Sequence, residues 1–325
     1  MHLPYSNRLA VCSSVTMAHP PSIPAPFSSD FSVLQKVIQH TFQTPRLTIQ
    51  QIEELPNHLH RIRLVRLSNG SRLVLKLAPS LSTSLLRHER QCLDTEALTL
   101  SLLAKSGLPT PRVLKHDSQA ASLHAPFLLT TYLYGTSFAE VRPYLSRADR
   151  LGIERQLRVL SSAISQHKST TFGPVSLVWT GRGHKRWREA FLSMMESALR
   201  DGEDMLVSLP YSQIREQVAK AERALDEVED ARLVVPALRN PSNLLIDGRT
   251  KEITGLLDFG MALWGDVEMG EGNDAGGTRG LLYACYGAVV AIVTNYHHPQ
   301  RDGTELDARK TLTMALAQLA ADCLE

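Results

Sequence analysis

The sequence of 325 residues has few cysteines, few aromatic residues and no excess of charge of either sign. Its four cysteines form no C-x-x-C pair, which argues against a metal ribbon and against a disulfide scaffold. With 35 Lys+Arg against 33 Asp+Glu, the net charge of +2 gives no reason to expect nucleic acid or a membrane surface as a partner. We therefore expect a globular protein of a reducing compartment, the cytoplasm.

Long apolar runs are also missing. The longest, residues 281–294, includes Gly287 and is shorter than the roughly 20 residues of a spanning helix, so it predicts a buried core helix. The first 29 residues contain no acidic residue and many Ser and Pro, without the apolar core of a secretory signal. We expect a disordered leader over residues 1–29.

The residues from 30 to 132 alternate between strand and helix patterns. Asn69-Gly70 stands between two β-rich runs, which is a strong hairpin signal. Leu93, Ala97, Leu100 and Ala104 recur at helical spacing. The expected elements are a helix at 31–42, strands at 60–67 and 72–77, a helix around 93–104, and strands at 112–116 and 127–132. This predicts a small mixed β-sheet N-lobe over 30–132.

The residues from 133 to 325 are mostly helical in pattern. Apolar residues at helical spacing predict helices at 148–166, 187–198 and 214–228, and again from Thr278. One hairpin interrupts them over 243–259, with its turn at 248–251. His297-His298 precedes Pro299 and is expected to end the last of these helices. The fold class is therefore α+β, with two lobes and a mainly helical C-lobe.

The hairpin brings two oxygen-bearing side chains together. Pairing about its turn places Asn243 nearly opposite Leu256, with Asp258 just beyond on the neighbouring strand. An amide oxygen and a carboxylate suit a hard cation such as Mg²⁺, which is held by few protein ligands plus phosphates. The pattern also fits a plain surface hairpin in which both residues cap turns.

Lys76 and Glu96 add a second pair. Lys76 ends an apolar strand, and Glu96 lies among the apolar positions of the next helix. A strand Lys and a helix Glu can pair and direct an ammonium group at phosphates. Each residue alone is more often a solvated charge, but the ordered set of Lys, Glu, Asn and Asp indicates a site.

The set resembles the protein-kinase-like fold of the aminoglycoside-phosphotransferase and choline-kinase family, over roughly residues 32–300. The matching segments are Val74-Leu75-Lys76, Thr95-Glu96-Ala97, Gly107-Leu108-Pro109-Thr110-Pro111, Asn243-Leu244-Leu245-Ile246-Asp247, and the run from Thr254 to Asp266 with its Leu256-Leu257-Asp258-Phe259-Gly260 and Trp264-Gly265-Asp266. This last run is the most specific of the matches.

The resemblance implies roles for individual residues. Lys76 and Glu96 would bind nucleotide phosphates, and Thr131, with Thr130 and Tyr132, would face an adenine. Asn243 and Asp258 would hold the metal. ATP and Mg²⁺ would be the cofactors if kinase chemistry is retained, and a small molecule in the cleft between the lobes would be the partner.

The family's catalytic loop is altered. Relatives read H-G-D-x-x-x-x-N, whereas this chain reads Val235-Pro236-Ala237-Leu238-Arg239-Asn240-Pro241-Ser242-Asn243. Leu238 has the family's spacing to Asn243, and Ala237 takes the position if one residue is inserted. Neither residue is acidic, so the group that accepts the proton of the substrate hydroxyl is missing.

The phosphate-covering loop is altered as well. Relatives have Gly and Ser, so that the backbone approaches the phosphates. Residues 53–60 contain no Gly, and Glu53 and Glu54 are expected to repel a triphosphate. His58 and His60 stand at period-2 spacing, where a surface strand edge is a better explanation than a metal site without a third ligand.

Three functional hypotheses stay open. The first is a repurposed enzyme, similar to fungal natural-product proteins of this family, that acts on a small molecule without ATP; Asp258, Asp266 or Glu268 would be the acid or base, and Lys76 or Arg239 the electrophile. The second is an ATP-dependent phosphotransferase, favoured by the retained metal pair. The third is a pseudokinase that binds a ligand and catalyses nothing.

Overall fold

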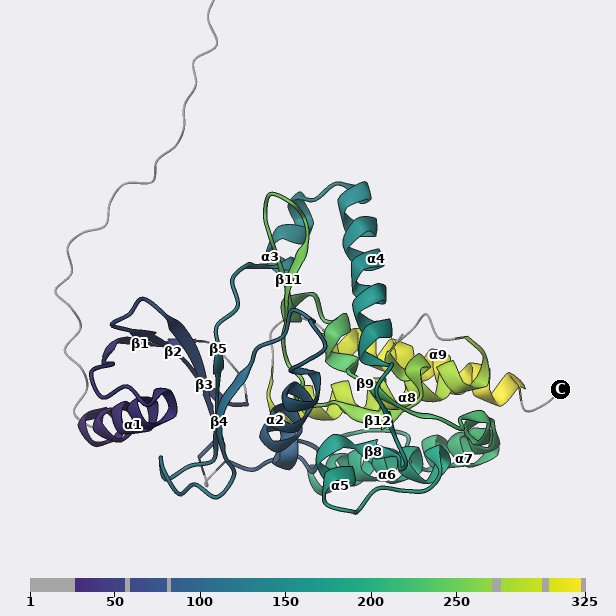
Figure 1. Cartoon of the computed structure of the whole chain (residues 1–325). Coiled ribbons are helices and arrows are strands. Elements are labelled where there is room, and N and C mark those ends of the chain that lie inside the picture. The colour runs from purple at the N-terminus through teal and green to yellow at the C-terminus, as the bar shows by residue number, and fades with distance from the viewer. Residues whose placement is uncertain (1–26, 56–58, 81–82, 271–275, 300–303, 323–325) are drawn as a thin grey trace, which may run out of the picture.

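The structure is a computed structural model that describes residues 27–55, 59–80, 83–270, 276–299 and 304–322. Its described residues form a sheet lobe up to residue 132 (the N-lobe) and a helical lobe after it (the C-lobe), as Figure 1 shows. The leader expected over residues 1–29 lies outside the described part except at its end. There the expectation was wrong, because helix α1 already begins at Phe27.

The N-lobe contains an antiparallel sheet with the strand order β1-β2-β3-β5-β4. Its described elements are α1 (Phe27–Phe42), β1 (Ile49–Leu55), β2 (Arg61–Leu67), β3 (Arg72–Leu77), the 3₁₀ turn η1 (Glu89–Gln91), α2 (Cys92–Leu103), β4 (Val113–Asp117) and β5 (Phe127–Thr131). The expected hairpin at Asn69-Gly70 is confirmed, since β2 and β3 pair from Arg66–Arg72 to Arg61–Leu77. Strand β1 was not expected.

The two faces of this sheet carry different residues because side chains alternate along a strand. On β3, Leu73, Leu75 and Leu77 face α1 and belong to one buried apolar cluster. Lys76 therefore faces the other way, toward α2. There Leu128, which pairs with Lys76, packs against Leu93 and Ala97 of α2. The sheet is thus covered by one helix on each face, and α2 lies between it and the C-lobe (Figure 1).

The C-lobe is mainly helical, as expected. Its described helices and 3₁₀ turns are α3 (Phe138–Val141), η2 (Arg142–Tyr144), α4 (Arg147–Ile164), α5 (Val175–Trp179), α6 (Trp187–Asp204), α7 (Tyr211–Ala221), η3 (Glu222–Glu227), η4 (Pro236–Arg239), η5 (Pro241–Asn243), η6 (Val267–Gly270), α8 (Gly277–His297) and α9 (Thr304–Asp322). Its strands are β6 (Thr136–Ser137), β7 (Lys168–Ser169), β8 (Gly173–Pro174), β9 (Ala231–Val234), β10 (Leu244–Ile246), β11 (Ile253–Leu256) and β12 (Leu263–Gly265).

Helix α8 is long and apolar enough to cross a membrane by length and composition alone. Its residues Leu282, Cys285, Val289 and Ile292 are buried in the C-lobe core, and the helix packs along α9. It is therefore the core helix that the sequence predicted, and its end at His297 confirms the expected helix terminus.

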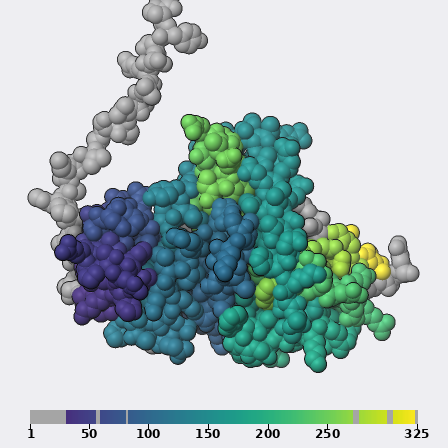
Figure 2. Space-filling view, in the orientation of Figure 1, coloured from purple at the N-terminus to yellow at the C-terminus, as the bar shows by residue number. Residues whose placement is uncertain are grey.

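The hairpin β10–β11 is fixed from two sides. Gln156 of α4 donates to the Lys251 carbonyl oxygen and accepts from the Ile253 amide, so the hairpin lies against α4, as the green and teal surfaces at the top of Figure 2 show. On the other side, β6 pairs with β10. Gly135, with φ 150°, allows this approach, because a Cβ there would lie 2.5 Å from Thr254 Oγ1.

Candidate functional site

Lys76 and Glu96 form an ion pair between β3 and α2. The Lys76 Nζ lies 2.6 Å from Glu96 Oε1 and 2.8 Å from Oε2, and Glu96 is buried. Burial works to lower the pKa of Lys76, but Glu96 and Asp258 outweigh it and hold that pKa above its ordinary value. Lys76 is therefore a cation at neutral pH, suited to stabilise negative charge rather than to accept a proton.

Asn243 and Asp258 meet at the mouth of the hairpin, as the sequence predicted. Leu244 pairs with Leu256, and the Leu257 amide donates to the Asn243 carbonyl oxygen. The Asn243 side-chain nitrogen donates to the Ala237 carbonyl oxygen at 2.9 Å and to Asp258 Oδ2 at 3.4 Å. Because the amide nitrogen makes both bonds, the amide oxygen and the carboxylate are the atoms that would ligate a hard cation, and this donor set suits Mg²⁺.

Asp258 adopts an uncommon backbone conformation. Its φ is 63°, in the left-handed region that only Gly, Asn and Asp visit readily. The following Phe259 is fully buried, and Gly260 approaches Cys92 closely enough that a Cβ would lie 3.1 Å from the Cys92 Cβ. The backbone is thus anchored directly after Asp258, which holds the carboxylate beside Asn243.

His60 lies beside Lys76 and Asp258, a position that was not predicted from the sequence. Burial and, to a smaller extent, the Lys76 charge lower the pKa of His60 to about 4, although Asp258 opposes the shift. The expected surface strand edge is therefore wrong for His60, and His58 lies outside the described residues. One feature of the sequence could have indicated this position: His60 directly precedes β2, the strand that pairs with the Lys76 strand β3. We call His60, Lys76, Glu96, Asn243 and Asp258 the junction site.

The two glutamates expected in a phosphate-covering loop lie instead on strand β1. Glu54 pairs across from Arg63, and its carboxylate lies 3.2 Å from Arg63 Nε. Glu53 pairs across from Leu64 and so occupies the sheet face that carries Lys76. Glu54 is therefore neutralised on the other face, and Glu53 alone adds negative charge on the side of the junction site.

The altered catalytic loop forms the two short turns η4 and η5. Leu238 is 3% exposed and belongs to the C-lobe core, whereas Ala237 is half-buried and its carbonyl oxygen contacts Asn243. The buried leucine favours Ala237 as the counterpart of the family's aspartate. The described loop thus has no carboxylate at either candidate position, in agreement with the sequence.

The predicted adenine-facing residues have other contacts. The Thr131 hydroxyl accepts a hydrogen bond from the Arg112 amide at 2.9 Å, and Thr130 is buried. Tyr132 packs edge-on against Tyr134 at 5.0 Å between ring centroids, with Arg72 over both rings. Thr131 thus joins β5 to the start of β4 through its side chain.

Asp266 belongs to a separate buried group. Its Oδ2 accepts from the Tyr283 hydroxyl at 2.6 Å, and Trp187 Nε1 donates to the same hydroxyl oxygen. Burial and Asp266 raise the pKa of Tyr283 above its ordinary value. Glu268 is paired with Arg279 at 2.7 Å. These contacts give Asp266 and Glu268 partners within the C-lobe that differ from the partners of Asp258 described above.

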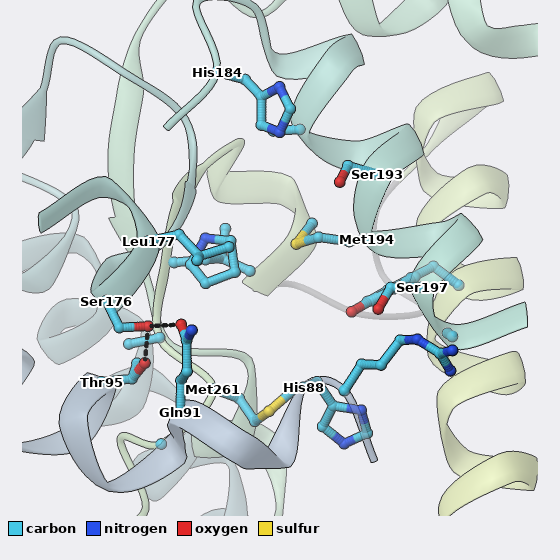
Figure 3. Close-up of a pocket in the computed structure, with 18 residues that line it drawn as sticks. His88, Gln91, Thr95, Ser176, Leu177, His184, Ser193, Met194, Ser197 and Met261 are labelled. Atoms are coloured by element: carbon cyan, nitrogen blue, oxygen red, sulfur yellow. Dashed lines mark hydrogen bonds between the residues drawn. The ribbon is translucent and has the colours of Figure 1, made fainter. Parts of the chain in front are cut away.

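A cavity of about 160 Å³ lies between α2, α5 and α6, and the segment that follows Asp258 forms part of its lining. Figure 3 shows its mixed lining, with Met194, Met261 and Leu177 beside His88, His184, Ser193 and Ser197. Thr95 donates to Ser176, which donates in turn to Gln91. Because Thr95 neighbours Glu96, this cavity adjoins the helix that holds Lys76 in place.

A second cavity of about 730 Å³ lies between α4 and the altered catalytic loop. Arg239 lines it, together with Leu238 of the same turn. Three further arginines, Arg142, Arg158 and Arg232, face it with a single acid, Glu154. Arg239 is thus placed among cations suited to an anionic ligand. This cluster could not be predicted from the sequence because its members are far apart in the chain.

The comparisons with known proteins agree with this architecture. The profile of the phosphotransferase enzyme family matches residues 52–269. Among proteins with curated functional descriptions, none matches this sequence. Several solved structures are similar in fold at low sequence identity.

A thermostable mutant of the aminoglycoside phosphotransferase APH(4)-Ia, in a ternary complex with AMP-PNP and hygromycin B, has a TM-score of 0.60 at 14% identity over 89% of this chain and 97% of its own. A putative aminoglycoside phosphotransferase from Ralstonia eutropha has a TM-score of 0.59 at 11% identity, covering 89% and 97%. Aminoglycoside 2'-phosphotransferase-IIIa, in a GDP complex, has a TM-score of 0.55 at 16% identity, covering 88% and 98%. The expected bilobal, protein-kinase-like α+β fold is confirmed.

Proposed function

This chain belongs to the phosphotransferase enzyme family, and we propose that it is a divergent member that acts on a small molecule at the junction site without transferring a phosphoryl group. The observation that carries the proposal is the altered catalytic loop. Leu238 is buried in the core and Ala237 is half-buried, and neither of these two candidate counterparts of the family's proton acceptor carries a carboxylate. General acid–base assistance is worth about 10²–10⁴-fold in rate, so a chain selected for phosphoryl transfer has a strong reason to keep that group.

The junction site retains groups for a different acid–base reaction. Asp258 is the acid or base, held by the anchored backbone that follows it. Lys76 is a fixed cation that stabilises a developing oxyanion or enolate. His60 is neutral at physiological pH because of its burial, so it adds no second positive charge beside Lys76. Asp266 would support the C-lobe through Tyr283 rather than take part in the reaction.

The ligand we propose is a small organic molecule, such as a natural-product intermediate undergoing cyclisation, isomerisation or elimination. The four arginines beside the catalytic loop favour a ligand with an anionic part, held by Arg239 and its neighbours. The net charge of +2 and the buried α8 support a cytoplasmic protein without nucleic-acid or membrane partners.

A phosphotransferase that uses ATP and Mg²⁺ is the second candidate. The intact Lys76–Glu96 pair and the adjacent Asn243 and Asp258 favour it, because these residues are suited to phosphates and a hard cation. Bound Mg²⁺ would neutralise phosphate charge there. Lys76 would orient the phosphates, and Asn243 and Asp258 would hold the ion.

One experiment separates the candidates. The gene is deleted in its source organism, and the metabolite that accumulates is offered to the purified chain with and without ATP–Mg²⁺. We expect conversion without ATP, and loss of conversion in the Asp258→Asn variant. A product that carries a new phosphoryl group, formed only with ATP, would establish the second candidate instead. Binding without any conversion, in either condition, would establish the non-catalytic pseudokinase.

A further inference from the structure

Three side chains that can ligate a metal converge outside the junction site. Glu89 lies in η1, directly before α2; His297 is the last residue of α8, and His298 follows it. One ligand atom from each of these residues lies within 4.8 Å of the other two. The Glu89 Oε1 and His298 Nε2 atoms are 3.0 Å apart. Two ligand atoms on a tetrahedral zinc ion are about 3.3 Å apart, because each lies roughly 2.0–2.1 Å from the metal.

Hydrogen bonds already orient these ligands. His297 Nε2 lies 2.8 Å from the Ser84 carbonyl oxygen, so a neutral ring donates there and carries its lone pair on Nδ1. Metal-ligating histidines commonly donate their other ring N–H to a backbone carbonyl in this way. Glu89 Oε2 accepts from the Leu86 amide at 2.9 Å, which leaves Oε1 directed at His298.

Burial makes this carboxylate depend on its partners, which are the Leu86 amide and the His298 ring. The Glu89 side chain is 4% exposed and that of His298 is 15% exposed. A buried charge is stable only when it is paired or bound to a metal. The two histidine rings pack edge-on, 4.4 Å apart, beside it. The three ligands are thus held near a binding geometry by the fold itself.

We propose that Glu89, His297 and His298 bind one divalent transition-metal ion of the zinc class. Two imidazole nitrogens and a carboxylate oxygen suit Zn²⁺, Co²⁺ or Ni²⁺, whereas Mg²⁺ and Ca²⁺ prefer oxygen ligands alone. This preference distinguishes the site from Asn243 and Asp258, whose donors are oxygens. The ion would join the start of α2, which carries Glu96, to the end of α8 in the C-lobe.

The test uses the full chain after removal of any affinity tag and of bound metal with a chelator. Titration with Co²⁺ is followed by the visible absorption bands of the ion, and zinc content is measured after dialysis against Zn²⁺. We expect one ion per chain, no competition by excess Mg²⁺, and a higher melting temperature with Zn²⁺. Glu89→Gln and His298→Asn should weaken binding by more than the roughly 10–100-fold typical of outer-shell changes.

His167→Asn is the matched control, since His167 is a part-buried histidine that contacts the Ile164 carbonyl oxygen elsewhere in the C-lobe. It should bind the metal like the unchanged chain. His297→Asn provides a further test if the other variants fail to fold. Unchanged Co²⁺ spectra in folded variants of all three residues, or an unchanged chain that takes up no Zn²⁺ or Co²⁺, would overturn the proposal.

Discussion

Lys76 Nζ lies 2.6 Å from Glu96 Oε1, and this ion pair joins strand β3 to helix α2 on the face of the sheet that meets the C-lobe. The side chains are 17% and 5% exposed, so each charge depends on the other for its stabilisation. Breaking a buried pair by removing one partner typically costs about 3–5 kcal/mol, whereas replacing both with apolar residues is often neutral.

The first prediction follows from this pair. Lys76→Met leaves the Glu96 carboxylate buried without its partner and should lower the free energy of unfolding by about 3 kcal/mol or more. The double variant Lys76→Met, Glu96→Leu should recover most of that loss, yet it should remain inactive. Urea denaturation of both variants measures the difference. Equal stabilities of the single and the double variant would show that the pair is not energetically coupled.

The second prediction concerns Asp258. Asp258→Asn should leave the fold intact, because Asn is nearly isosteric and tolerates the φ of 63°. Its activity in the metabolite assay should fall by at least ~10²-fold, as expected when an acid–base group is lost. Asp258→Ala tests the backbone strain. Because Ala adopts a positive φ less readily than Asn, this variant should melt at a lower temperature than Asp258→Asn. An Asp258→Asn protein with full activity would exclude Asp258 from the reaction, and one that fails to fold would assign it a structural role.

The third prediction concerns the missing base. Ala237→Asp should fold, since Ala237 is half-buried, whereas Leu238→Asp places a carboxylate in the core and should be strongly destabilised. Neither variant should gain ATP-dependent phosphotransfer, because positioning carries most of that catalysis and the loop over the phosphates has diverged. A coupled assay for ADP release measures this. Phosphotransfer by Ala237→Asp would refute the proposal that the site has been repurposed.

The fourth prediction concerns pH. The pKa of His60 is lowered to about 4 in the folded chain from an ordinary value of 6.5, so the unfolded chain binds the proton more readily. The contribution of neutral His60 to the free energy of unfolding is fully present above about pH 6.5. It is lost as the pH falls toward 4, and about 2 kcal/mol of this free energy is lost at about pH 5. Urea denaturation at about pH 7.5 and about pH 5 should therefore show a smaller loss for His60→Gln than for the unchanged chain. Parallel losses in the two proteins would contradict the half-buried placement of His60 beside Lys76.

Much of the junction site could be predicted from the sequence because its residues sit on local patterns. The hairpin register follows from the turn at 248–251, and it brought Asn243 and Asp258 together as expected. Side chains alternate along β3, so Lys76 lies on the sheet face opposite the one that carries the leucines of this strand. Strand β1 was harder to predict, since the alternation of Ile49–Leu55 is weak and Glu53 and Glu54 read as loop.

Contacts between distant segments could not be predicted from the sequence. Asp266 looked like a site residue beside Asp258 in the chain, but the turn through β12 and η6 pairs it with Tyr283 of α8. Glu89 was not singled out in the sequence, and His60 and His298 were interpreted there only as a strand edge and a helix end. Their surroundings depend on how the lobes and helices pack, and local periodicity does not specify that packing.

The measurement that tests the central claim most directly is calorimetry of the full chain with millimolar ATP and Mg²⁺, with Lys76→Met as the control. The altered loop and Glu53 on the sheet face of Lys76 predict weak binding or none, and no difference between the two proteins. A dissociation constant in the low micromolar range that is lost in Lys76→Met would contradict the account and establish nucleotide binding as the function of the site.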